Sequence, residues 1–252
     1  MRYALISDVH ANLPALDAVL ADIRRVHADA LYHLGDLVGY ASWPNEVVAR
    51  ITEERIAGVA GNYDSTVATG YKHCGCRYEN EQQEALSHVS YEWTREHASA
   101  TTKRALAALP FRIDVRPLGG HVSGPTLTLV HGSHALNTVY VTDDRGDDFL
   151  SNMARAVGAR AGDVIAFGHT HKPWHRIVND IHFVNTGSVG RPKDSDWRAG
   201  YVVLSFSPSG MDVEFRRVEY DVERAAQAIL ESALPDEFAW HLRSGGKSLV
   251  AG

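Results

Sequence analysis

Five short polar segments stand where apolar runs end or begin, and they constrain the fold of this chain more than any other feature. They read Asp8-Val9-His10, Gly35-Asp36, Gly61-Asn62, His131-Gly132 and Gly168-His169-Thr170-His171. In an open α/β sheet, loops at the carboxyl ends of the strands gather at one edge and form the ligand site. Asp, His and Asn are all metal-ligand types, and seven of them can hold two metal ions if one carboxylate bridges. The pattern therefore predicts an α/β protein with a two-metal site.

Apolar runs and helical patterns alternate along the first third of the chain. Strands are expected at residues 3–7, 30–34 and 56–60, with helices beginning at Pro14 and covering residues 44–54. Such alternation predicts right-handed crossovers and parallel strands. The remaining expected strands are residues 111–116, 126–130, 164–167, 174–178, 181–184, 201–206 and 211–218, and the remaining expected helices are 81–109 (broken near 98–102), 144–161 and 221–233. Residues 65–80 and 117–125 are expected to be loops, and turns at 179–180 and 207–210 predict late hairpins.

Composition narrows the classes of protein that fit. The chain has 252 residues and a net charge of −6, which argues against an extended nucleic-acid-binding surface. We expect a single domain over residues 1–252, with a frayed tail from about residue 244. There is no apolar run of about 18 residues and no signal-peptide pattern, so we expect a cytoplasmic protein without a membrane span. Cys74 and Cys76 make no disulfide framework, and with His73 they are a poor match to a zinc site.

The order of the five segments resembles that of the calcineurin-like metallophosphoesterases, whose pattern runs D-x-H, G-D, G-N-H-D/E, H and G-H-x-H. The stretch from Asn185 to Pro192 is similar to the small, phosphodiesterase-type bacterial branch of that family. The resemblance implies a four-layer α-β-β-α sandwich of two mixed sheets flanked by helices. It also implies two divalent metal ions, and the mixed imidazole, carboxylate and amide set suits Mn, Fe or Zn.

The resemblance assigns the metal ligands position by position. One metal would be held by Asp8, His10 and His171, and the other by Asn62, His131 and His169, with Asp36 bridging the two.

One position departs from the family pattern. The His of G-N-H-D, which is thought to protonate the leaving group, is Tyr63 here, followed by Asp64. A phenol is poorly matched to proton transfer at neutral pH. Tyr63 therefore either donates a proton weakly or is a bystander, and His134, three residues after His131, is a second candidate donor.

Three further features of the sequence have two possible interpretations each. Asn12 is either the N-cap of the Pro14 helix or an amide donor to substrate. Arg191 follows a glycine-containing loop and is either a phosphate ligand or a solvated residue. Tyr40 and Trp43 either pack in the core or form the floor of a base-binding cleft. His241 has no motif context and is expected to be a bystander.

The predicted function is hydrolysis of a small phosphoester, including nucleotides, by a water molecule that two metals activate. A phosphodiesterase or a nucleotide-type phosphohydrolase fits this pattern. A protein serine/threonine phosphatase shares the same metals and is an alternative. A non-catalytic scaffold of the same fold, such as a retromer subunit, is another, but the chain retains all seven metal-ligand residues, which argues against it.

Overall fold

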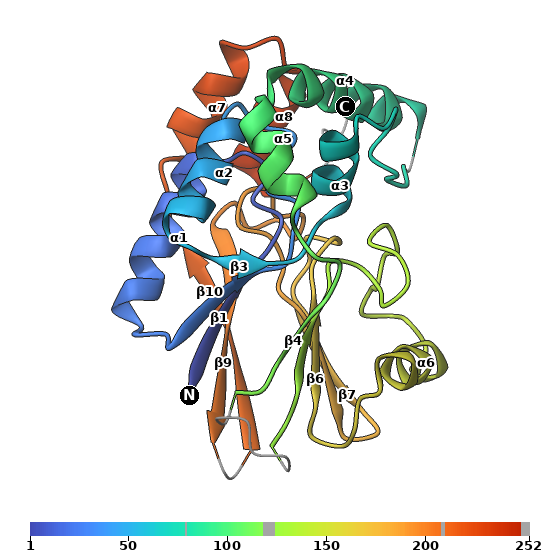
Figure 1. Cartoon of the computed structure of the whole chain (residues 1–252). Helices are drawn as coiled ribbons and strands as arrows, with labels where there is room; N and C mark the ends of the chain where they lie inside the picture. Colours follow the sequence, from blue (N-terminus) through green and yellow to red (C-terminus); the bar gives the residue numbers. More distant parts are fainter. Residues whose placement is uncertain (79, 118–123, 208–209, 248–252) are drawn as a thin grey trace.

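The computed structural model describes residues 1–78, 80–117, 124–207 and 210–247, and within them two five-stranded sheets pack face to face (Figure 1). The first sheet has the order β10 (Gly210–Val218), β9 (Ala199–Ser207), β1 (Arg2–Ile6), β2 (Ala30–His33), β3 (Ala57–Gly58). The second has the order β4 (Ile113–Val115), β5 (Leu127–Leu129), β6 (Val164–Phe167), β8 (Ile181–Asn185), β7 (Trp174–Val178). Both sheets are mixed, because β1–β3 and β5, β6 and β8 run parallel while β9, β4 and β7 pair antiparallel.

Strand β1 shows why an uninterrupted apolar run forms a central strand. Its alternate side chains serve two cores: Tyr3 and Leu5 face the second sheet, whereas Ala4 and Ile6 face the helices. The layer between the sheets is apolar from both sides, with Val202 and Leu204 from one sheet and Leu127 and Leu129 among those from the other. A strand that is buried on both faces needs no polar alternation.

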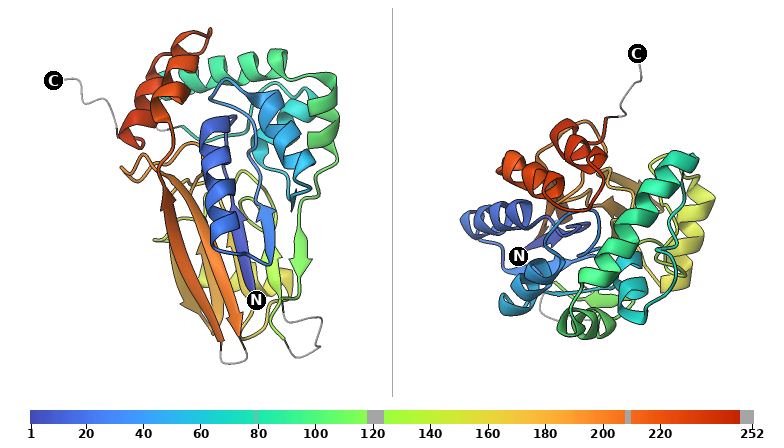
Figure 2. Two further views of the ribbon diagram at one scale, coloured as in Figure 1. Left: turned by 90° about the vertical axis from the view of Figure 1, so that its left-hand side faces the viewer. Right: turned by 90° about the horizontal axis from the view of Figure 1, so that it is seen from above.

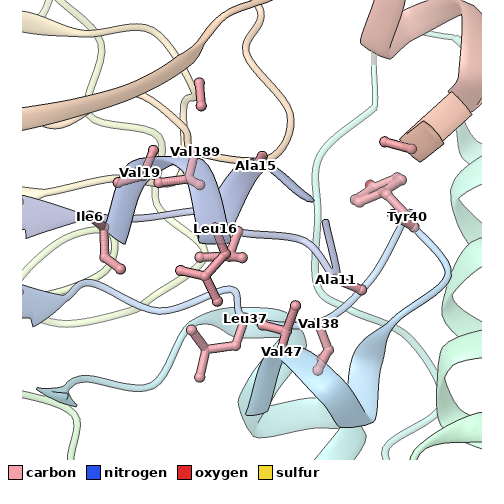
Figure 3. Close-up of a cluster of buried hydrophobic side chains, with 14 of the residues drawn as sticks. Ile6, Ala11, Ala15, Leu16, Val19, Leu37, Val38, Tyr40, Val47 and Val189 are labelled. Atoms are coloured by element: carbon pink, nitrogen blue, oxygen red, sulfur yellow. The ribbon is translucent and has the colours of Figure 1, made fainter. Parts of the chain in front are cut away.

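Helices cover the outer faces of both sheets, which confirms the sandwich that the sequence predicted. Helices α1 (Leu13–Arg25), α2 (Pro44–Glu53) and α7 (Val222–Leu230) pack on the first sheet, and Figure 3 shows part of the core beneath α1 and α2. Helix α6 (Asp147–Val157) packs on the second. Helices α3 (Asn62–Thr69), α4 (Glu81–His97), α5 (Ala100–Ala107) and α8 (Glu237–Ser244) gather over the upper edge of the first sheet (Figures 1 and 2).

Helix α3 corrects the prediction that residues 65–80 are entirely loop. Asp64 accepts a hydrogen bond from the Gly61 N–H (3.0 Å) and so caps the helix start. The Ser and Thr hydroxyls of α3 donate hydrogen bonds to main-chain carbonyls one turn earlier, as in Ser65 to Gly61 (2.8 Å) and Thr69 to Ser65 (2.8 Å). Gly70, with φ +69°, ends the helix. The helix forms despite a composition typical of loops, because it is capped at both ends and buries Tyr63 and Val67.

The end of the chain also differs from the expectation. Helix α8 was not predicted, and residues 244–246 are hydrogen-bonded instead of frayed: Ser195 N–H donates to Gly245 O (2.9 Å) and Gly246 N–H to His241 O (3.0 Å). Residues 248–252, and parts of the expected segments 117–125 and 207–210, lie outside the described residues. The hairpin turn at Asn179 and Asp180 is confirmed, since both have positive φ. No helix in the described part of the chain is long and apolar enough to cross a membrane.

Candidate metal centre

The predicted ligands converge at the carboxyl ends of strands from both sheets. Asp8 and His10 follow β1, Asp36 follows β2, and Asn62 begins the helix after β3; from the second sheet, His131 follows β5, and His169 and His171 follow β6. Five of these residues have positive φ between 47° and 66°: Asp8, His10, Asp36, His169 and His171. Non-glycine residues seldom adopt that conformation, and such strain gathers at functional sites.

The first group consists of Asp8, His10 and His171. Its ligand atoms all lie within 4.8 Å of one another. The Nε2 atoms of His10 and His171 are 3.2 Å apart, and Asp8 Oδ1 lies 3.3 Å from His171 Nε2 and 3.8 Å from His10 Nε2. All three residues are buried. The group therefore presents two imidazole nitrogens and one carboxylate oxygen to a common point.

The second group consists of Asp36, His131 and His169, joined by Asn62. Here His131 Nε2 lies 3.2 Å from His169 Nδ1, 3.1 Å from Asn62 Oδ1 and 3.4 Å from Asp36 Oδ2. All four residues are buried. The ring of Tyr140 covers His169, with 4.1 Å between the ring centroids.

Asp36 lies between the two groups. Its Oδ2 atom is 3.4 Å from His131 Nε2 in the second group and 3.8 Å from His10 Nε2 in the first. Its other oxygen is held by the Tyr63 N–H (2.9 Å). One carboxylate oxygen thus lies within 4 Å of a histidine nitrogen from each group.

The histidine tautomers fit metal binding. The Nδ1 atoms of three of them lie at hydrogen-bond distance from main-chain carbonyls: His10 to Val38 O (3.0 Å), His131 to Leu34 O (2.6 Å) and His171 to Arg191 O (2.6 Å). A carbonyl only accepts, so Nδ1 of each ring carries a proton and Nε2 faces the site. Asp8 Oδ1 is buried and has no hydrogen-bond donor among the described residues, while Oδ2 accepts from Ser7 Oγ (2.6 Å). A buried carboxylate oxygen with no donor is suited to a cation.

Two glycines permit this close approach. A Cβ on Gly61 would lie 2.1 Å from Asp36 Oδ1, and a Cβ on Gly168 would lie 2.4 Å from Asp8 Oδ2. Any side chain there would displace a carboxylate of the site. The sequence pattern pairs a glycine with each of these loops for this steric reason.

The electrostatics of the bare cluster favour an added positive charge. Burial, together with the nearby charge of Asp36, raises the pKa of Asp8 to about 7. Burial alone would lower the pKa of His131, but the charge of Asp36 and the hydrogen bond to it outweigh burial and raise that pKa to about 9. Burial lowers the pKa of His10 and of His169 to about 3, so both rings are neutral and available as ligands.

Tyr63 and Asp64, which the sequence placed at the acid position, are both fully buried. The Tyr63 ring packs edge-on against His10 (5.6 Å between centroids) and beside Tyr40 (5.1 Å). The Asp64 carboxylate accepts from the Leu37 N–H (2.9 Å) in addition to the Gly61 N–H. Asp64 therefore ties the loop of Asp36 to the start of α3.

Asn12 caps helix α1, and His134 lies on the protein surface. Asn12 Oδ1 accepts from the Ala15 N–H (3.2 Å), and Nδ2 donates to Gly190 O (3.0 Å) and Tyr220 OH (3.3 Å). Both amide hydrogens are used within the protein, so Asn12 is an N-cap that also anchors the Gly190 loop. His134 is exposed on the loop after His131.

Arg191 lies beside the first group. Its carbonyl oxygen is the partner of His171 Nδ1, and its guanidinium carbon lies 3.9 Å above the Tyr40 ring. The side chain is buried, with 7% of the residue exposed. The structure thus places the Arg191 side chain close to the first group.

Sequence reasoning missed the contact that orients Asn62. Its Nδ2 donates to Cys74 O (3.0 Å) and to Cys76 Sγ (3.3 Å), which turns Oδ1 toward His131. Cys74 and Cys76 follow Asn62 by only 12 and 14 residues, and this short separation was the one sequence feature that pointed to the contact. The loop of residues 71–78 is therefore part of the wall of the site.

Comparisons with known proteins agree with this geometry. The calcineurin-like phosphoesterase superfamily domain model matches residues 1–208. An uncharacterized protein of Methanocaldococcus jannaschii, MJ0912, is 29% identical over 256 residues, covering 92% of this chain and 93% of that protein. The crystal structure of a metallophosphoesterase from Sphaerobacter thermophilus is similar with a TM-score of 0.75 and 28% identity, covering 97% and 99% of the two chains.

A hypothetical protein from Pyrococcus horikoshii, PH1004, shares the fold with a TM-score of 0.81 at 21% identity, over 98% of this chain and 99% of that one. The family match covers all seven candidate metal ligands and both sheets up to β9. The chain belongs to the calcineurin-like phosphoesterase superfamily and is a phosphoester hydrolase.

Proposed function

We propose that the protein is a phosphodiesterase or nucleotide-type phosphohydrolase that works with two divalent metal ions, Mn, Fe or Zn. The position of Asp36 carries this proposal. One oxygen of that carboxylate lies within 4 Å of a ligand nitrogen from each of the two buried groups. A shared carboxylate is what brings two ions close enough to act on one phosphate.

Each group of side chains would have a separate role in this reaction. Asp8, His10 and His171 would hold one ion, and Asn62, His131 and His169 the other, with Asp36 between them. When bound, the ions would activate a water molecule and neutralise the phosphate oxygens. Arg191, beside the first group, would add a fixed positive charge for the anionic substrate.

Substrates with good leaving groups fit this site better than simple alkyl esters. The family's acid position holds Tyr63, whose side chain is fully buried, and His134 is exposed on its loop. Burial, with Tyr40 nearby, raises the pKa of Tyr63 well above 10, so the phenol gives up its proton poorly at neutral pH. A phosphodiester with an acidic leaving group such as a phenol, or a nucleotide that releases a phosphate group, needs little protonation of its leaving group.

An activity panel on metal-stripped protein tests the proposal. The apoprotein is reconstituted with Mn, Zn or Mg and assayed on bis(4-nitrophenyl) phosphate, 4-nitrophenyl phosphate and an alkyl phosphate. We expect activity only with metal, and a kcat/KM on the aryl diester at least equal to that on the alkyl monoester. A clear preference for the alkyl monoester would show that another efficient general acid operates. Equal activity in the stripped and reconstituted proteins would refute the metal-dependent mechanism.

A further inference from the structure

Arg191 is a buried cation without an anionic partner. Only 7% of the residue is exposed, and its Nε atom is buried with no hydrogen-bond acceptor. Over the described part of the chain its guanidinium makes neither an ion pair nor a hydrogen bond. Its recorded contacts are with two aromatic rings, Tyr40 at 3.9 Å and Phe238 at 5.6 Å. A buried charge that is left unpaired is costly, so this guanidinium is poised for an anion that the chain itself does not supply.

The Tyr40 ring lies between the Arg191 guanidinium and His10 of the first metal group. Arg191 O bonds to His171 Nδ1 (2.6 Å), and the Tyr40 ring beneath the guanidinium meets the His10 ring edge-on at 5.0 Å. Among the described residues, no recorded hydrogen bond, ion pair or ring contact joins Arg191 to Asp36 or to the second group. The hydrolysed phosphate must reach both groups around Asp36, whereas Arg191 borders only the first.

The C-terminal helix α8 builds the wall that holds this side chain. Phe238 is buried and meets the Tyr40 ring at 5.2 Å, so the two rings form a corner around the guanidinium. His241, one turn later, also has a buried Nε2 atom without a hydrogen-bond partner. The family domain match ends at residue 208, so α7 and α8 lie beyond the matched region. Both helices stand over the same edge of the fold as the loops of the site (Figures 1 and 2).

We infer that Arg191, held between Tyr40 and Phe238, binds a second anionic group of the substrate, one that is not itself hydrolysed. The substrate class is then phosphoesters that carry a further phosphoryl group next to the reacting one. This inference rests on the proposed function. The chemistry suits it, because a guanidinium fork binds a phosphoryl group through two parallel hydrogen bonds. Phe238 acts through Arg191 and is a positioning residue.

Binding of two probes to the metal-loaded full-length protein tests the inference without turnover. Calorimetry gives the dissociation constants of inorganic phosphate, which has one phosphoryl group, and of methylenediphosphonate, a non-hydrolysable compound with two. The readout is the ratio of the two constants, with bound metal measured after each titration. We expect Arg191→Gln to reduce the preference for the diphosphonate by about tenfold, the free energy of one or two charge-assisted hydrogen bonds.

Matched variants separate binding from general damage. Lys172→Gln removes the same charge from an exposed side chain directly after His171, and it should leave the ratio unchanged. Phe238→Leu should lower the preference and Phe238→Tyr should retain it, because only an aromatic ring completes the corner. Trp240→Leu, at an exposed position on the same helix, is the control for α8.

Three results would overturn the inference. If Arg191→Gln weakens both probes equally, the guanidinium contacts the reacting phosphate. If neither constant changes, the side chain is structural only. If Arg191→Gln does not fold or loses metal, an unchanged ratio in Phe238→Leu refutes the role of α8. Failure of the hydrolysis panel would leave these binding ratios measurable, so the two proposals fail separately.

Discussion

The main-chain N–H of Tyr63 donates a hydrogen bond to Asp36 Oδ1 (2.9 Å), while the Tyr63 side chain is buried beside His10, Tyr40 and Tyr91. The residue at the family's acid position thus supports the shared carboxylate through its backbone. Any amino acid except proline can make that bond. The support of Asp36 is therefore independent of the side chain, which explains how the site tolerates a tyrosine at this position.

We predict that Tyr63→Phe changes kcat/KM on activated esters by less than about threefold. The hydroxyl is buried and has no hydrogen-bond partner among the described residues, so its removal leaves no polar group stranded. The melting temperature should be unchanged or slightly higher. A leaving-group series, with metal content checked for each sample, provides the measurement. A loss above about tenfold on every substrate at full metal content would place the phenol in the catalytic machinery, since general acids contribute about 100-fold or more.

The fold was predictable because its strands are buried on both faces and its helices are amphipathic. The runs around Ala4 and Ile165 contain no polar interruption, which local sequence shows directly. Helix α3 was missed because Ser65 and Thr66 are common in loops, whereas the burial of Tyr63 and Val67 that supports the helix depends on tertiary packing.

The candidate ligands could also be proposed from the sequence, because their residue types, order and strand-end positions match the family pattern. The contacts of the residues around these ligands could not be predicted from the sequence. Arg191 meets Tyr40 and Phe238 only through tertiary packing, and Asn12 turns both its amide hydrogens inward toward Gly190 and Tyr220. These residues are far apart in sequence, so their contacts follow from the tertiary fold and not from any local pattern.

We predict that Asp36→Asn removes at least one bound metal and lowers activity by more than about 100-fold. An amide offers one weakly charged oxygen where the site needs a carboxylate facing both groups. Metal content by mass spectrometry and kcat on an aryl diester decide the matter. Asp114→Asn, on a half-exposed carboxylate paired with Arg112 away from the site, is the control. Two metals and full activity in Asp36→Asn would refute the shared-carboxylate arrangement.

We predict that Cys76→Ala weakens metal binding at the second group by about tenfold. Cys76 Sγ is one of two acceptors that hold Asn62 Nδ2 and so aim Oδ1 at His131. Loss of such an outer contact typically costs 10–100-fold in metal affinity, about what is expected here. Competition with a chelator gives the measurement, and Cys76→Ser should recover much of the affinity.

Cys74→Ala is the matched control for that experiment. Cys74 contacts Asn62 only through its main-chain oxygen, and its thiol lies 3.2 Å from Tyr78 OH and accepts from the Cys76 main-chain N–H (3.3 Å), so neither thiol contact reaches Asn62. The alanine variant should therefore keep the affinity of wild type. Equal losses in Cys74→Ala and Cys76→Ala would mean that the loop as a whole, and not the thiol contact, positions Asn62.

His33 predicts a pH dependence of stability that is separate from the metal centre. The side chain at the end of β2 is fully buried, neither ring nitrogen has a hydrogen-bond partner among the described residues, and burial lowers its pKa to about 3. In the unfolded chain a histidine titrates near pH ~6.5. Above that pH both states are neutral and stability is unaffected. As the pH falls further, only the unfolded state takes up the proton, so the native state loses stability until about pH 3.

We therefore predict that His33→Leu makes the protein less sensitive to acid. The slope from one such group is about 1.4 kcal/mol per pH unit, so wild type should lose about 2 kcal/mol by pH 5 that the variant keeps. Urea unfolding of both proteins from pH 8 to pH 5 measures the difference, and subtracting the two curves cancels the histidines of the metal site. His88→Gln, at an exposed position on α4, should follow wild type throughout. A constant difference between His33→Leu and wild type across this range would show that the imidazole is protonated in the native state or gains a partner on protonation.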